Sequence, residues 1–173
     1  SVLADPNHLR ALLFSALIIF SGFTVIPYIT LYAVNNVGIA QADIPIVYLV
    51  GGSATFISAR LIGRWADRHG KIEIYRWVAL LAALPLLVVT HAGPLPLGLW
   101  LICTTSFFVL TSGRMIPAMA VIASAAQPNL RGTFMSLNGT VQSLAMGLAT
   151  TLAGFLTSLD GSGRIVGYPL VGY

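Results

Sequence analysis

A dense cluster of charged residues lies between two long apolar runs of the sequence. The segment Gly63-Arg64-Trp65-Ala66-Asp67-Arg68-His69-Gly70-Lys71 places Asp67 among basic residues, with a glycine near each end. Glycine permits a tight chain reversal. A carboxylate at a helix end can accept hydrogen bonds from backbone amides or Arg68, and can face the positive end of a helix dipole. We interpret the segment as a short charged loop that latches one conformation. A basic loop that only sets membrane topology is the alternative.

Arg114 is the second candidate, because it is a cation inside an apolar run. An Arg at the centre of a membrane helix costs about 2.5 to 3.5 kcal/mol on insertion scales, so it is expected to face a bundle interior or a cavity. There it would act on a substrate or in proton coupling. The alternative is that Arg114 lies nearer the cytoplasmic end and anchors the helix by extending its charge to the surface.

Polar residues along the first apolar run form a third candidate set. At 100° per residue they share an arc of about 80° on one helix face; they are Ser21, Thr24, Tyr28, Tyr32 and Asn35. Pro27 lies among them and is expected to kink the helix. We predict that Thr24, Tyr28 and Tyr32 line a substrate path. Hydrogen bonding between packed helices is the alternative.

The composition indicates the kind of molecule that positions these residues. The 173 residues are 57% hydrophobic and 8% charged, whereas soluble domains carry about 25% charged residues. A membrane-crossing helix needs about 20 apolar residues. The sequence therefore predicts an all-α polytopic transmembrane helix bundle in a single domain, residues 1–173. Its five helices are expected at about 10–34, 43–63, 73–90, 97–125 and 133–158.

Basic residues indicate how the bundle is oriented. Arg10, the charged cluster and Arg131 all fall on one side of the predicted helices, while the first and third loops contain no Lys or Arg. By the positive-inside rule, the amino terminus is cytoplasmic. Topology thus explains the formal charge of +4, and we expect no nucleic-acid partner.

Small and capping residues suggest how the helices pack. Gly51, Thr55, Ala59 and Gly63 recur every fourth residue on the second helix, which favours close helix approach. An arc of small and polar residues on the fifth helix is also assigned to packing rather than to substrate binding; it comprises Ser136, Thr140, Ser143, Gly147, Thr150 and Gly154. Asp43 is predicted to cap the second helix.

Residues that could support catalysis or metal binding do not gather in the sequence. His8, His69 and His91 lack metal-ligand spacing, and Cys103 stands alone. The apolar runs hold no paired acids and no activated nucleophile. We therefore expect neither an enzyme, a cofactor nor a metal site.

The motif Gly63-x-x-x-Asp67-Arg68-x-Gly70-Lys71 resembles the signature loop of the major facilitator superfamily, which joins the second and third helices of a six-helix half. Trp65 replaces the usual Leu, and Ile72 replaces a second basic residue. Arg114-x-x-Pro117 followed by Arg131-Gly132 resembles the fourth or tenth helix of that family. The fifth helix lacks a Gly-Pro motif and the tail is Gly-rich, which favours the carboxy-terminal half of a twelve-helix transporter.

This resemblance carries expectations about function. It implies five of the six helices of one half, a latch role for the charged motif, and secondary active transport by alternating access. Similarity to bacterial drug and sugar exporters implies proton-coupled efflux of a small molecule across the inner cell membrane. The expected partners are the lipid bilayer, the substrate, protons and the other half of the transporter, which would carry the proton-binding acid. A non-transporting membrane module for partner assembly or ligand sensing is the alternative.

Overall fold

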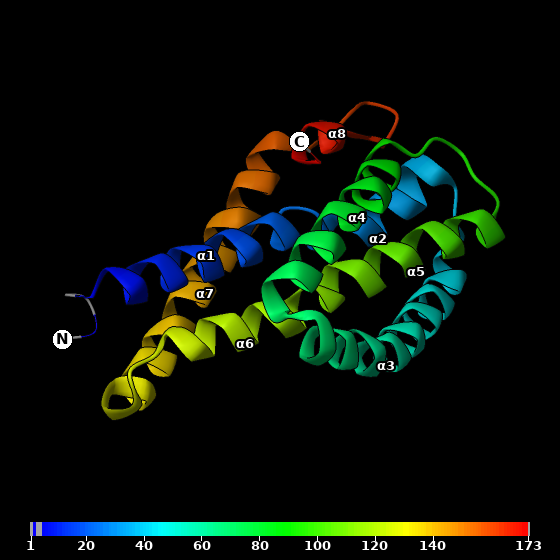
Figure 1. The fold of residues 1–173 in the computed structure, drawn as a ribbon. Helices are drawn as coiled ribbons and strands as arrows, with labels where there is room; N and C mark the ends of the chain where they lie inside the picture. Colours follow the sequence, from blue (N-terminus) through cyan, green and yellow to red (C-terminus); the bar gives the residue numbers. More distant parts are fainter. Residues whose placement is uncertain (1, 3–4, 173) are drawn as a thin grey trace.

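The computed structural model describes Val2 and residues 5–172, which form a bundle of helices with one short two-stranded sheet (Figure 1). Five helical segments are long and apolar enough to cross a membrane. They are Pro6–Val37, Gln41–His69, Lys71–His91, Leu97–Ala125 and Pro128–Leu156. The predicted all-α polytopic bundle is therefore confirmed.

The first span is interrupted near its middle. Helix α1 (Pro6–Phe23) is followed by a 3-10 turn at Ile26–Tyr28, then by α2 (Ile29–Tyr32) and a π-helical segment, Ala33–Val37. Pro27 has no amide hydrogen to donate to the carbonyl of Phe23, and its ring crowds that carbonyl, so the regular helix ends there. The predicted kink is confirmed, and the helical span extends beyond 10–34 at both ends.

The charged cluster is helical, so its interpretation as a loop over residues 63–71 is wrong. Helix α3 (Ile44–His69) continues through it, and α4 (Lys71–His91) begins one residue after Gly70. Only Gly70 leaves the helical conformation, with φ of 98°. Arg68 and His69 occupy the last turn of α3, where cations interact favourably with the carboxyl end of the helix dipole. The motif residues can thus extend the helix until the glycine reverses the chain.

The amino-terminal end of α3 also differs from expectation. Asp43 has φ of −89° and ψ of −12° and makes no capping hydrogen bond. A side-chain cap normally requires extended backbone at that position. Here a 3-10 turn at Gln41–Asp43 leads directly into the helix. The predicted Asp43 cap is therefore wrong.

The fourth span covers Leu97–Ala125, as predicted, with a local irregularity at Arg114, whose own backbone remains in the helical region. Helix α5 (Leu97–Gly113) ends just before Arg114, and α6 (Met115–Ala125) begins just after it. Pro117 cannot donate to the carbonyl of Gly113, four residues earlier. The sequence analysis noted Pro117 without assigning an irregularity to it. The irregularity places Arg114 at the junction of α5 and α6.

The Gly-rich tail folds back onto the bundle. After α7 (Arg131–Leu156), strands β1 (Ser158–Leu159) and β2 (Ile165–Val166) pair antiparallel, and α8 (Tyr168–Val171) follows. The side chain of Asn36 accepts a hydrogen bond from the Ile165 amide at 2.8 Å and donates one to the Ile165 carbonyl at 2.9 Å. Figure 1 shows α8 beside the end of α7. The tail thereby ties the last span to the first.

Helix packing agrees with the small-residue pattern on α3 but only in part with that on α7. The ring of Phe108 fills the space beside Gly51, so α3 and α5 approach closely as predicted. On α7 the buried face instead carries Phe134, Asn138, Ala145, Ala149 and Ala153. Most of the predicted packing arc is exposed, namely Ser136, Thr140, Ser143, Gly147 and Gly154. Thr150 and Gly154 pack against Tyr28, whereas the other four residues of the arc face away from the buried stripe, so packing within this bundle involves only one end of the arc.

The turn at Gly70 gives a first testable prediction. Replacing Gly70 with Ala puts a Cβ on a backbone conformation that other residues avoid, at a cost of about 1 to 3 kcal/mol. We expect Gly70→Ala to lower the thermal unfolding midpoint of the purified intact protein in detergent. Gly52→Ala is the matched control, because Gly52 lies in α3 with open space around it. Equal stability of the two variants would contradict the assigned role of Gly70.

Candidate functional site

Arg114 joins the first and fourth spans. Its Nη2 donates a hydrogen bond to Ser21 Oγ at 2.8 Å and lies 3.5 Å from the carbonyl oxygen of Ile18. Gly22 of α1 lies beside the guanidinium, since a Cβ at that position would be in van der Waals contact with Nη2 at 3.7 Å. The Nε atom is buried and has no hydrogen-bond partner. One guanidinium therefore connects α1 to the α5/α6 junction and retains an unused donor.

The position of Arg114 along its span is close to the middle. At 1.5 Å per residue it lies about 17 Å from Ala125 and about 26 Å from Leu97. Among the described residues the hydrogen bonds of its guanidinium go to uncharged oxygens. The acidic residues are found near helix ends or in the tail: Asp5, Asp43, Asp67, Glu73 and Asp160. The positive charge at membrane depth is thus available to an anionic group from outside this set.

A polar contact that was not predicted from the sequence joins α7 to a different face of α1. Gln142 of α7 donates through Nε2 to Ser15 Oγ at 2.8 Å and contacts Met119 Sδ at 3.6 Å. Asn138 is buried, and its Oδ1 has no partner in the described structure. The four-residue spacing of Asn138 and Gln142 was the available signal. The more numerous small residues on the opposite face obscured it.

The three predicted path residues of the first span each make a different contact in the structure. Thr24 is buried and donates to the Ser21 carbonyl of its own helix at 3.2 Å. The Tyr28 hydroxyl lies 3.5 Å from the Thr150 carbonyl oxygen. The Tyr32 hydroxyl donates to the Ala92 carbonyl at 2.8 Å, and its ring packs on that of Tyr168. They do not share a cavity with Arg114 in this conformation, and their path role remains a prediction.

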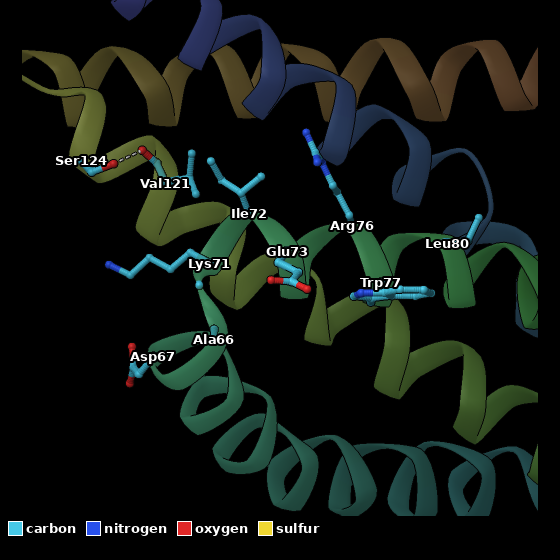
Figure 2. Close-up of a pocket in the computed structure, with 11 residues that line it drawn as sticks. Ala66, Asp67, Lys71, Ile72, Glu73, Arg76, Trp77, Leu80, Val121 and Ser124 are labelled. Carbon is cyan, nitrogen blue, oxygen red and sulfur yellow. Dashed lines mark hydrogen bonds between the residues drawn. The ribbon is translucent and has the colours of Figure 1, made fainter.

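The predicted latch residues border an open groove between α3, α4 and α6, with a volume of about 1110 Å³ (Figure 2). Asp67, Gly70 and Lys71 line this groove, whereas Gly63 lies further back on α3 and packs near Ile116. Arg68 is exposed on the last turn of α3. Figure 2 shows Asp67 near the start of α4, the positive end of that helix. The carboxylate is thus free to accept donors from an approaching segment.

The described residues contain no group of three or more His, Cys, Asp or Glu side chains that could hold a metal ion. His8 instead has a structural role, since its Nε2 accepts a hydrogen bond from the Gln127 amide at 3.2 Å. Cys103 is a free thiol.

Comparison with known proteins identifies one family. A sequence model described as Major Facilitator Superfamily matches residues 1–150. The match includes the first four candidate spans and most of α7. No curated protein and no solved structure matches the chain.

The contact between Arg114 and Ser21 generates the second prediction. Ser21→Ala removes the acceptor of the short hydrogen bond, and such bonds between membrane helices contribute about 0.6 to 1.7 kcal/mol. We expect a lower unfolding midpoint for Ser21→Ala in detergent. Ser106→Ala is the matched control, because the Ser106 hydroxyl bonds only within its own helix, to Ile102. A midpoint for Ser21→Ala no lower than that of the control would contradict a stabilising bridge.

Proposed function

This chain belongs to the major facilitator superfamily, a family of membrane transporters, and we propose that it forms part of a secondary active transporter for a small molecule. The observation that supports this proposal best is the hydrogen bond between Arg114 and Ser21, which joins the interrupted first span to the α5/α6 junction within two membrane-spanning segments. Discontinuous helices in transporters expose backbone groups and charges near the bilayer midplane, where substrates and coupling ions bind.

The interruption at Ile26–Tyr28 would allow the two parts of the first span to move separately, and the hydrogen bond that Pro117 cannot make would allow α6 to bend relative to α5. Movement of α6 relative to α1 would carry Arg114 away from Ser21 and towards a substrate or an acidic residue. In the present conformation Ser21 and Ile18 satisfy part of the guanidinium. Alternating access would then consist of an exchange of partners by Arg114, with Thr24, Tyr28 and Tyr32 near the break in the first span.

The rest of the transport path is proposed to come from a second helix bundle of the same transporter. The exposed arc of small and polar residues on α7 would face that bundle, since a lipid-facing surface would favour apolar side chains. Gly63, Asp67, Arg68, Gly70 and Lys71 would form the latch, with the Asp67 carboxylate accepting donors from the second bundle in one conformation. Because the five acidic residues of this chain lie near helix ends or in the tail, a proton-binding acid is assigned to the second bundle.

The basic residues support a membrane orientation, whereas the efflux direction is carried over from the resemblance to drug and sugar exporters. Arg10, Lys71 and Arg131 lie at the ends of helices that share one side of the bundle. We assign that side to the cytoplasm by the positive-inside rule. The proposed activity is proton-coupled efflux across the inner cell membrane.

Proton flux in vesicles containing the intact transporter tests this function. We expect substrate-dependent proton movement for one or more members of a panel of lipophilic cations and small sugars. Arg114→Gln should reduce the rate about tenfold, as expected for the loss of about 1.4 kcal/mol, and Arg114→Lys should retain part of it. If correctly inserted protein shows no substrate-dependent proton movement for any member of the panel, efflux of these classes of substrate is contradicted. That result would favour a module that binds partners or senses a ligand.

The latch gives a separate prediction. Asp67→Asn removes the charge without changing the side-chain shape, so it should lower the transport rate while membrane insertion stays normal. Asp43→Asn is the matched control, because Asp43 lies at the opposite end of α3 and its side chain makes no capping hydrogen bond. An unchanged rate for Asp67→Asn in the same vesicles would rule out the latch role.

A further inference from the structure

A second cavity opens between α1, α4 and α6, beside the groove that contains the latch residues. Its volume is about 580 Å³. One wall is apolar and consists mainly of Phe14, Ile72, Val121 and Ile122. Polar side chains border the remainder: Asn7, Arg10, Tyr75, Arg76 and Ser124. The cavity thus combines an apolar wall with two cations.

The two arginines come from different helices and have no counter-charge in the cavity. Arg10 of α1 and Arg76 of α4 are exposed and form no hydrogen bond or ion pair within the described residues. No acidic residue is among those that line the cavity. Figure 2 shows Arg76 extending from α4 towards α1, whereas Asp67 lies on the α3 side. Glu73 borders the neighbouring groove, which adjoins this cavity and which Arg76 also lines.

Both arginines lie in the first two turns of their helices and line the same cavity. Arg10 is about 6 Å from the start of α1 and Arg76 about 7.5 Å from the start of α4, at 1.5 Å per residue. Side chains on a helix point towards its amino terminus, so long basic side chains here reach the membrane edge. The positive ends of two helix dipoles lie at this edge as well. The local field therefore favours an anion at headgroup level.

The nearest carboxylate on α1 is already engaged. Asp5 Oδ1 accepts the Asn7 amide at 2.8 Å, and Oδ2 accepts Gln127 Nε2 at 2.8 Å. The hydrogen bond from the Asn7 amide lowers the pKa of Asp5 below its usual value. Asp5 thus stays ionised as the cap of α1, and it is not among the residues that line the cavity.

We propose that this cavity binds an anionic glycerophospholipid of the cytoplasmic leaflet. Its phosphate would lie between Arg10 and Arg76, because the planar guanidinium matches phosphate oxygens in a bidentate arrangement. The upper acyl segments would lie along Phe14, Ile72 and Val121. Basic pockets between membrane helices on the cytoplasmic side bind anionic headgroups in this way. The proposal depends on the orientation assigned above, but not on the substrate or coupling ion.

Lipid retention by the intact protein tests the proposal. The protein is purified from micelles that contain equal amounts of phosphatidylglycerol and phosphatidylcholine, and bound lipid is counted by native mass spectrometry. We expect selective retention of phosphatidylglycerol. Each Arg→Gln change should weaken retention about fivefold, and the pair Arg10→Gln with Arg76→Gln about 25-fold. The pair of Arg→Lys changes should retain most of the selectivity, which separates lost charge from lost folding.

Arg131→Gln is the matched control, since Arg131 is an exposed cation at the same membrane edge but outside the cavity. It should retain phosphatidylglycerol as the unmodified protein does. Equal retention of the two lipids, or equal loss in the control and the double variant, would overturn the proposal.

A photo-crosslinking residue at Tyr75 identifies the occupant in native membranes. Cross-linking to an anionic lipid is expected. Cross-linking only to another stretch of protein would show that a polypeptide covers the cavity, and would contradict a lipid site. Displacement of bound phosphatidylglycerol by inorganic phosphate at the same concentration would also overturn the proposal, because the site would then bind a free anion as well as the lipid.

Discussion

The cost of holding the Arg114 charge inside a membrane helix is the constraint on which the centre of this structure depends. About 2.5 to 3.5 kcal/mol is needed to place an Arg there, and one hydrogen bond to Ser21 offsets only part of it. The carbonyl oxygen of Ile18, 3.5 Å from Nη2, provides a second uncharged acceptor. The bridge to Ser21 and the packing of α1 beside the α5/α6 junction accommodate this charge, while Pro27 and Pro117 account for the helix irregularities themselves.

The two ends of the bundle differ in how closely their segments pack. At one end the tail closes over the break in the first span, where the Tyr168 hydroxyl donates to the Val25 carbonyl at 3.0 Å. At the other end α1, α3, α4 and α6 leave open grooves bordered by charged residues. The closed end is suited to anchor the spans, and the open end is suited to contacts with lipid or with other segments.

The sequence predicted the five membrane helices because long apolar runs separated by turn residues have few alternatives in a bilayer. It also predicted the kink at Pro27, since proline removes a particular helix hydrogen bond. It failed at Gly63 to His69 because charged residues continue a helix as well as they form a loop, and only Gly70 decides where the chain reverses. The Arg114–Ser21 pair could not be found from sequence, as helical periodicity places residues on a face but does not say which helix that face meets. Asn138 and Gln142 were missed for a different reason, because the more numerous small and polar residues on the opposite face of α7 suggested the wrong buried face.

A distance measurement tests most directly the proposal that the α1 and α6 segments move as Arg114 changes partners. Spin labels at Leu13 of α1 and Ser124 of α6, in the intact protein with Cys103 replaced and reconstituted in lipid, report the separation of these segments. We expect two resolved distance populations, with a clearly different ratio in Arg114→Gln, because loss of the bridge to Ser21 changes the relative stability of the two conformations. A single distance that Arg114→Gln leaves unchanged would contradict the account.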